Sequence, residues 1–343
     1  MSYQLGLLDQ SPILEGSSAV DALQQTVRLA QKAEEWGYSR FWVSEHHHSE
    51  QVAGSSPEVL MSYLLARTKS IRIGSGGVML QHYSPFKVAE NFHVLSTLAP
   101  GRVDLGIGKA PGGLPLSTKA LQFGTVNDGQ DFEERFLFLK KLIENSVDED
   151  HPLAGIEATP IPPEKPNLFL LGASPRSAQL AADLQVPFVF ALFINGDVKA
   201  LEESAHVYRN GYQDGRFLLS LAAVAADSQK EAEELAKDQK MYKVHLQSGR
   251  IVTVSTLEQA HAFGKQAEQS YEVEEQASYI IAGTSVYVKK VLNKFHASYQ
   301  VDEFILHSPV QKVEERVRSF QLLSPNGSND NSLTEEEGET YVS

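Results

Sequence analysis

Short apolar runs alternate with amphipathic stretches along most of this 343-residue chain. Such runs are typical of strands buried on both faces, and apolar residues spaced three and four apart are typical of helices packed on a sheet. We expect strands at residues 3–9, 40–44, 71–78, 103–107, 168–172, 187–192, 217–226 and 301–306. We expect helices at residues 18–37, 57–67, 85–98, 128–143, 176–184, 198–213 and 312–323.

The regular alternation of strand and helix, with a spacing of roughly 30 residues, indicates parallel βα units. Eight strands with helices between them predict an α/β fold in the form of a (β/α)8 barrel with insertions. An open doubly wound sheet is the alternative architecture. The first strand is not followed by a G-x-G-x-x-G motif, which weighs against that alternative.

Three segments depart from the alternation. Residues 145–167 are rich in proline and acidic residues, so we expect an excursion over the surface. Residues 228–300 are too long for one crossover, and we expect an insertion at roughly 240–280 beside the open face of the barrel. This insertion could act as a lid or form a packed helical hairpin that does not move. The barrel domain would span 1–323, and the acidic tail 324–343 is expected to be disordered.

Composition narrows the classes of protein that the chain can belong to. The formal net charge of −14 argues against a nucleic acid or an anionic membrane as partner, because both bind cationic surfaces. The chain has no cysteine, which excludes disulfides, thiolate metal sites, iron–sulfur clusters and a cysteine nucleophile. The sequence shows no signal peptide and no apolar run of roughly 20 residues, so a cytoplasmic location is expected.

The expected strand 40–44 ends in one acid and three imidazoles, Glu45, His46, His47 and His48. Active-site residues of parallel-sheet proteins commonly lie just past the carboxyl ends of the strands, and histidine exchanges protons near neutral pH. These histidines could serve in acid–base catalysis or be ordinary hydrogen-bonded loop residues. A weak metal site is a third interpretation. Adjacent side chains on an extended chain point to opposite faces, however, so at most two of the three histidines could share one ion.

Three further strand ends carry candidate binding groups. The glycines at 74–77 could let a flat ring approach the backbone, or they could reflect a bulge or tight barrel packing. Lys109 follows the fourth strand and could bind an anion, although it could equally be solvated. The turn 172–177 opens a helix whose free amides, with Ser174 and Ser177, could hold a phosphate, or Ser174 could be an ordinary cap. Together these groups indicate a flat, phosphorylated cofactor.

These residues resemble the flavin-dependent monooxygenases related to bacterial luciferase, over most of residues 1–323. Four ordered motifs carry the resemblance: the strand followed by Glu45-His46-His47, the segment 73–78 followed by Ser84-Pro85, the segment 101–112, and the segment 172–175.

The resemblance implies a TIM barrel that reacts reduced FMN, supplied by a separate flavin reductase, with O₂ to oxygenate a small organic substrate. His46 matches the family's histidine near the reacting flavin carbon, where it would assist proton transfer. Gly76 and Gly77 match a pair that commonly holds a cis peptide bond under the ring. Lys109 and the turn with Ala173, Ser174 and Ser177 match the phosphate-binding groups, and no metal is implied.

The resemblance also implies a partner, and the chain differs from the family at two positions. Helices 57–67 and 85–98 match the family's dimer interface, so a homodimer is implied. Luciferase has a cysteine where this chain has Gly108, and relatives often have arginine at the position of Lys109, so light emission is not implied.

Two other functions remain open at the level of the sequence. One is a dehydrogenase that uses the deazaflavin F420 on the same barrel, and the other is a flavin-binding protein without turnover. The substrate is not determined, although Tyr83, Phe193 and Tyr242 are expected near the opening of the barrel.

Overall fold

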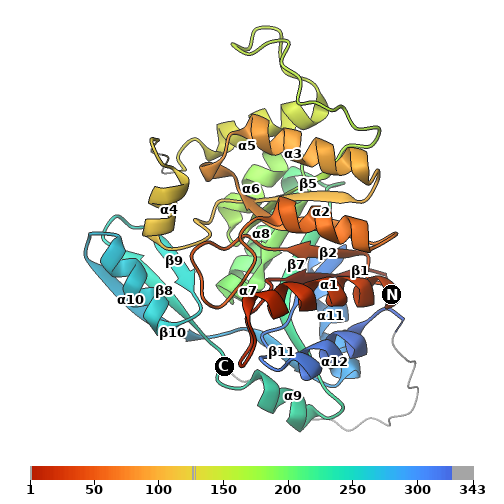
Figure 1. Ribbon diagram of the computed structural model, residues 1–343. Helices are drawn as coiled ribbons and strands as arrows, with labels where there is room; N and C mark the ends of the chain where they lie inside the picture. Colours follow the sequence, from red (N-terminus) through yellow and green to blue (C-terminus); the bar gives the residue numbers. More distant parts are fainter. Residues whose placement is uncertain (1, 126, 128, 327–343) are drawn as a thin grey trace.

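A closed barrel of eight parallel strands forms the centre of the molecule (Figure 1). The computed structural model describes residues 2–125, 127 and 129–326. Around the barrel the order is β1-β2-β3-β4-β5-β6-β7-β12, and β12 pairs with β1, so the open-sheet alternative is wrong. The strands are β1 (Gln4–Asp9), β2 (Arg40–Val43), β3 (Arg72–Met79), β4 (Val103–Gly108), β5 (Asn167–Gly172), β6 (Phe188–Ala191), β7 (Phe217–Ala225) and β12 (Glu303–His307).

Helices cover the outside of the barrel, and the expected long ones are all present. Their first turns carry the local signals seen in the sequence, including a capping box between Ser18 and Asp21 and prolines at the starts of the second and third helices. The long helices are α1 (Ala19–Glu35), α2 (Pro57–Arg67), α3 (Pro85–Leu98), α5 (Phe132–Glu144), α6 (Pro175–Asp183), α8 (Val198–Gly211), α11 (Ser285–Tyr299) and α12 (Val313–Leu323).

Several short helices were not expected from the sequence. They are η1 (Leu80–His82), α4 (Pro115–Leu121), α7 (Leu192–Asn195) and α9 (Gln229–Ala236). The helix expected from residue 128 begins only at Phe132. Of these helices, α4 follows β4 and faces the loop after β2.

The barrel interior has a buried ion-pair network at its amino end and an apolar layer above it. Arg40 is buried inside, with Nη1 at 2.6 Å from Asp104 Oδ2 and Nε at 2.7 Å from Glu303 Oε1. Above this network lies an interior cluster, against which two partly buried side chains pack: Leu171 near the carboxyl end of β5, and Phe193 from α7, which follows β6. The cluster consists of Leu8, Trp42, Phe169, Val189, Leu218 and Ile305.

The segment between β7 and β12 contains a second, antiparallel sheet. Its order is β10-β8-β9, formed by β8 (Lys240–Leu246), β9 (Ile251–Val254) and β10 (Tyr271–Ala277), and α10 (Leu257–Gln266) packs on it. The next strand, β11 (Ile280–Gly283), pairs with β7. The alternative of a packed helical hairpin is therefore wrong.

A long connection runs between α5 and β5. Residues 145–166 form neither helix nor strand and extend away from the barrel at the top of Figure 1. In the expected tail 324–343, residues 327–343 lie outside the described residues. Among the residues that are described, no helix is long and apolar enough to cross a membrane.

Candidate active site

Glu45 connects the loop after β2 to the end of β3. Its carboxylate is 1% exposed. Its Oε1 accepts a hydrogen bond from the Tyr83 hydroxyl at 2.9 Å and lies 2.8 Å from His47 Nε2, and its Oε2 accepts one from the Met79 amide at 3.1 Å. This buried acid therefore fixes the position of the histidine-containing loop.

His46, the next residue, is half-buried. The Nδ1 atom lies 3.0 Å from the Ser44 hydroxyl, and the main-chain amide donates to the Gly54 carbonyl at 2.8 Å. Burial lowers the pKa of the imidazole to about 4, and the nearby charge of Glu45 offsets this only in part. His46 is therefore neutral near pH 7, and its Nε2 is the ring nitrogen left for a reacting group.

The neighbouring histidines do not converge on one point. His46 contacts Ser44 and His47 contacts Glu45, whereas His48 is exposed and has a positive φ of 52°. Within residues 2–125, 127 and 129–326, no group of three or more His, Asp or Glu side chains is placed to hold a metal ion.

The glycines of β3 are required by packing inside the barrel. A Cβ on Gly76 would lie 2.9 Å from Leu8 Cδ1, and one on Gly77 would lie 2.7 Å from the Gly106 carbonyl oxygen. The register between β3 and β4 shifts at this point. The bulge and packing interpretation is thus confirmed, while the flat-ring interpretation stays a prediction. The Gly76–Gly77 peptide bond is cis, as the family resemblance implied.

Lys109 follows β4 at the mouth of the barrel. Its side chain is exposed, and Nζ lies 5.6 Å from the centroid of the Phe132 ring. Among the residues that the structure describes, no carboxylate forms an ion pair with Lys109. In an acidic protein this leaves a cation available for an anionic ligand.

The turn after β5 begins α6 with a capped first turn. Ser174 Oγ accepts a hydrogen bond from the Ser177 amide at 3.3 Å and lies 3.1 Å from the Ser177 hydroxyl. The Ala173 carbonyl accepts a hydrogen bond from Asn195 Nδ2 at 2.7 Å. The ordinary capping interpretation is confirmed, and a phosphate role for this turn stays a prediction.

The first turn of α5 lies beside both candidate phosphate-binding groups. Phe132 contacts Lys109, and the next residue, Glu133, has its Oε1 3.6 Å from Nη2 of Arg176 in the first turn of α6. Lys109 and the start of α6 therefore lie on the same side of the barrel. His46 belongs to β2, which is separated from β5 by β3 and β4.

Three buried polar residues were not identified from the sequence: Asp9 and His307, which end β1 and β12, and Arg316 of α12. Asp9 Oδ1 lies 2.9 Å from Arg316 Nη2, and both side chains are buried. The ring of His307 packs against that of Phe193, with ring centroids 5.3 Å apart and the planes tilted by 40°. Burial, with a further contribution from Arg316, lowers the pKa of His307 to about 4. Asp9 and His307 each follow an apolar run at the end of a strand. His46 follows the apolar run of β2 in the same way, so this pattern could have identified Asp9 and His307.

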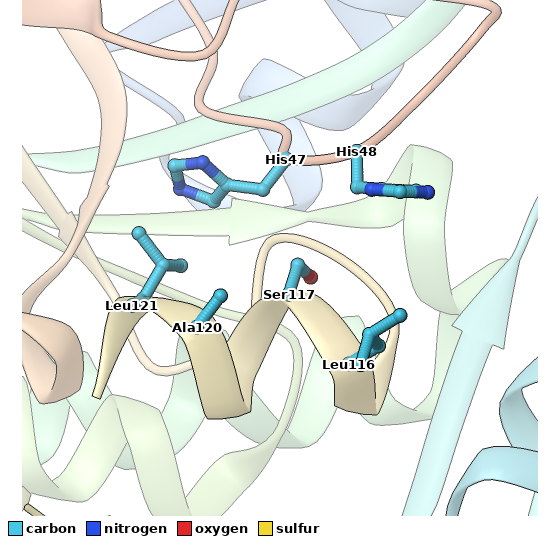
Figure 2. A pocket seen from close by; sticks show the side chains of 6 residues that line it. All are labelled: His47, His48, Leu116, Ser117, Ala120 and Leu121. Carbon is cyan, nitrogen blue, oxygen red and sulfur yellow. The ribbon is translucent and has the colours of Figure 1, made fainter. Parts of the chain in front are cut away.

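A hollow of about 300 Å³ lies between the loop after β2 and α4 (Figure 2). The ring of His47 and the exposed side chain of His48 form one side, and one face of α4 forms the other. The lining residues are His47, His48, Leu116, Ser117, Ala120 and Leu121. No local sequence pattern indicates this hollow, because α4 has only seven residues and no side-chain cap.

Comparisons with known proteins agree with this architecture. Residues 4–324 match the family model described as luciferase-like monooxygenase. The chain is 45% identical over 324 residues to the N-acetyl-S-alkylcysteine monooxygenase of Bacillus subtilis (strain 168), covering 94% of this chain and 97% of that protein.

Two solved structures share the fold. Apo-MsnO8 is 32% identical, with a TM-score of 0.75 and coverage of 94% of this chain and 97% of the other. The oxygenating constituent of 3,6-diketocamphane monooxygenase from Pseudomonas putida, in complex with FMN, has a TM-score of 0.69 and coverage of 95% and 97%. At 17% identity, this second likeness shows the fold alone.

Proposed function

The chain belongs to the luciferase-like monooxygenase family, and we propose that it uses reduced FMN and O₂ to oxygenate a small organic substrate. One observation carries the proposal within the family. The imidazole of His46 is neutral, half-buried and fixed at the carboxyl end of the barrel, where its Nε2 can exchange a proton with a bound group.

The residues at the mouth fit FMN chemically. Lys109 lacks a carboxylate partner among the described residues and would attract the phosphate, while the amides at the start of α6, with Ser174 and Ser177, would donate hydrogen bonds to it. The Gly76–Gly77 segment, without side chains, would lie against the flat ring. The partly buried Leu171 and Phe193 provide apolar surface nearby.

When bound and reduced, FMN supplies two electrons, so that one oxygen atom of O₂ enters the substrate and the other leaves as water. The protein's own contribution is to bind, to orient and to exclude water. His46, held at Nδ1 by Ser44, would hold or move the proton at Nε2. The apolar interior below the mouth would keep bulk water from the reacting atoms.

The insertion at roughly 240–280 would serve as a lid of the 1–323 barrel domain. Gln259 Nε2 donates to Gln51 Oε1 at 3.1 Å, and Gln266 Oε1 accepts from the Leu116 amide at 3.0 Å. These contacts join the antiparallel sheet and α10 to the loop after β2 and to α4. Both contacts are exposed hydrogen bonds, which open at low energetic cost.

The protein would act with other protein chains. A separate flavin reductase would supply the reduced FMN. A homodimer would form through α2 and α3, whose outer faces expose large apolar side chains that a second copy would cover. These side chains are Val59, Tyr63, Val94 and Leu98.

An N-acetyl-S-alkylcysteine is the first candidate substrate, because the relative with that activity is 45% identical along nearly the whole chain. The test supplies a flavin reductase, FMN and this substrate under ¹⁸O₂ and follows the product by mass spectrometry. We expect one ¹⁸O atom in the product. Turnover only with reduced or oxidised F420 would instead identify a deazaflavin dehydrogenase, and FMN binding without oxygen uptake on any candidate would identify a binding protein.

A further inference from the structure

The hollow above α4 has two chemically different sides. Leu116, Ala120 and Leu121 line it from α4, while His47 and His48 line it from the loop after β2 (Figure 2). Leu116 is 56% exposed although it is a large apolar side chain. A volume of about 300 Å³ is at the small end of ligand pockets, so a compact molecule would fill it.

His47 is held in one orientation by the buried acid behind it. Its Nε2 lies 2.8 Å from Glu45 Oε1, an oxygen that already accepts a hydrogen bond from Tyr83. A carboxylate oxygen is a hydrogen-bond acceptor. The Nε2 atom of His47 therefore carries the hydrogen and donates a hydrogen bond to Glu45. In the neutral ring Nδ1 is then an acceptor, and none of the described residues forms a hydrogen bond with it.

The insertion fixes the apolar wall. The Leu116 amide donates to Gln266 Oε1 at 3.0 Å, and Lys119 Nζ lies 2.9 Å from Glu268 Oε1. Leu114, just before α4, packs on the apolar cluster between the antiparallel sheet and α10. Movement of the insertion would therefore move one side of the hollow and leave His47, which is anchored to β3 through Glu45, in place.

We propose that this hollow is the substrate-recognition pocket and that it selects a small molecule carrying an alkyl group close to an amide N–H. The alkyl group packs on Leu116, Ala120 and Leu121, and the amide donates its hydrogen to His47 Nδ1. The proposal rests on the proposed function for the reaction that follows binding. The proposal adds that α4 recognises the alkyl end of the substrate and the loop after β2 recognises the amide end. It also makes α4 the element that limits the length of the alkyl group.

The first experiment measures binding to the protein without flavin, by titration calorimetry with N-acetyl-S-methylcysteine and N-acetyl-S-hexylcysteine. Ala120→Leu narrows the hollow, and we expect at least a tenfold loss of affinity for the hexyl compound and less than a threefold change for the methyl compound. Ala297→Leu, at an exposed position of α11, is the matched control and should change neither. Equal affinities in Ala120→Leu and in the control would overturn the proposal.

The second experiment tests the amide contact. N-methylation of the ligand amide should weaken binding at least fivefold in the original protein, and in His47→Phe the two ligands should bind equally. A similar loss from N-methylation in both proteins would remove His47 from the pocket. Thermal melting confirms that each variant is folded.

The outcomes separate this proposal from the proposed function. If the binding results hold but no oxygen enters the ligand with FMN and a reductase, the pocket stands and the monooxygenase reaction with this cofactor fails. If oxygenation occurs while Ala120→Leu leaves the KM ratio of the two compounds unchanged, the reaction stands and the pocket is overturned.

Discussion

The hydroxyl of Tyr83 donates a hydrogen bond of 2.9 Å to Oε1 of Glu45 and so joins the turn after β3 to the loop after β2. Burial, with a further contribution from the charge of Glu45, raises the pKa of Tyr83 well above its usual value. The tyrosine therefore stays protonated at any physiological pH and remains a donor to the buried carboxylate.

Replacing this donor should cost stability. We expect Tyr83→Phe to lower the free energy of unfolding by about 1–3 kcal/mol, because a buried carboxylate loses one of its hydrogen bonds. Urea unfolding measures the change. Tyr287→Phe, at an exposed position of α11, is the control and should change stability by less than about 0.5 kcal/mol. Equal effects of the two substitutions would contradict the assigned role of the Glu45 contact.

Lys109→Ala should weaken FMN binding by about tenfold or more, because it removes the cation proposed to hold the phosphate. Fluorescence titration of FMN gives the dissociation constant. Lys109→Arg should retain the affinity for FMN. Lys312→Ala, which removes an exposed lysine at the N-cap of α12, should leave that affinity unchanged. A dissociation constant that stays the same in Lys109→Ala would remove this lysine from the site.

His46→Ala should bind FMN within about twofold of the original affinity but lose turnover by about 10²-fold or more, the usual worth of a positioned proton donor or acceptor. Stopped-flow absorbance of the reduced protein mixed with O₂ follows the reaction. His206→Ala, which replaces an exposed histidine of α8, serves as the control. Traces for His46→Ala that overlay those of the original protein would refute the proton-transfer role.

Acid should destabilise the fold partly through His307. Burial lowers its pKa to about 4, whereas an unfolded histidine titrates near 6.5, so between these values the unfolded chain binds more protons and stability falls as the pH falls. Groups near the ring are Asp9, Arg316 and His46.

The variant His307→Asn does not titrate in this range. Its stability deficit relative to the original protein, measured by urea unfolding, should therefore shrink by about 1–2 kcal/mol between pH 7.5 and pH 5. A deficit that stays constant over this interval would show that the folded and unfolded chains protonate His307 alike.

The barrel follows from local pattern, because each buried strand and each amphipathic helix is encoded by its own residues. The antiparallel sheet does not, since β10 pairs with β8, which lies 25 to 37 positions away in register, and no local pattern encodes that pairing. The seven-residue α4 is likewise too short to show a helical period.

Local pattern likewise indicates only part of the candidate site. His46 and Lys109 follow strands and are visible in the sequence as polar strand ends. Arg316 meets Asp9 only because β12 closes the barrel beside β1, a contact between distant residues that no local pattern encodes. The glycines at 76 and 77 were ambiguous, because their neighbours Leu8 and Gly106 come from other strands.

A crystal structure of the protein with bound FMN tests the central claim most directly. The account predicts the flavin ring against Gly76 and Gly77 with His46 beside it, and the phosphate in contact with Lys109, Ser174 and Ser177. FMN bound on another face of the molecule, or with its phosphate away from Lys109 and the start of α6, would contradict it.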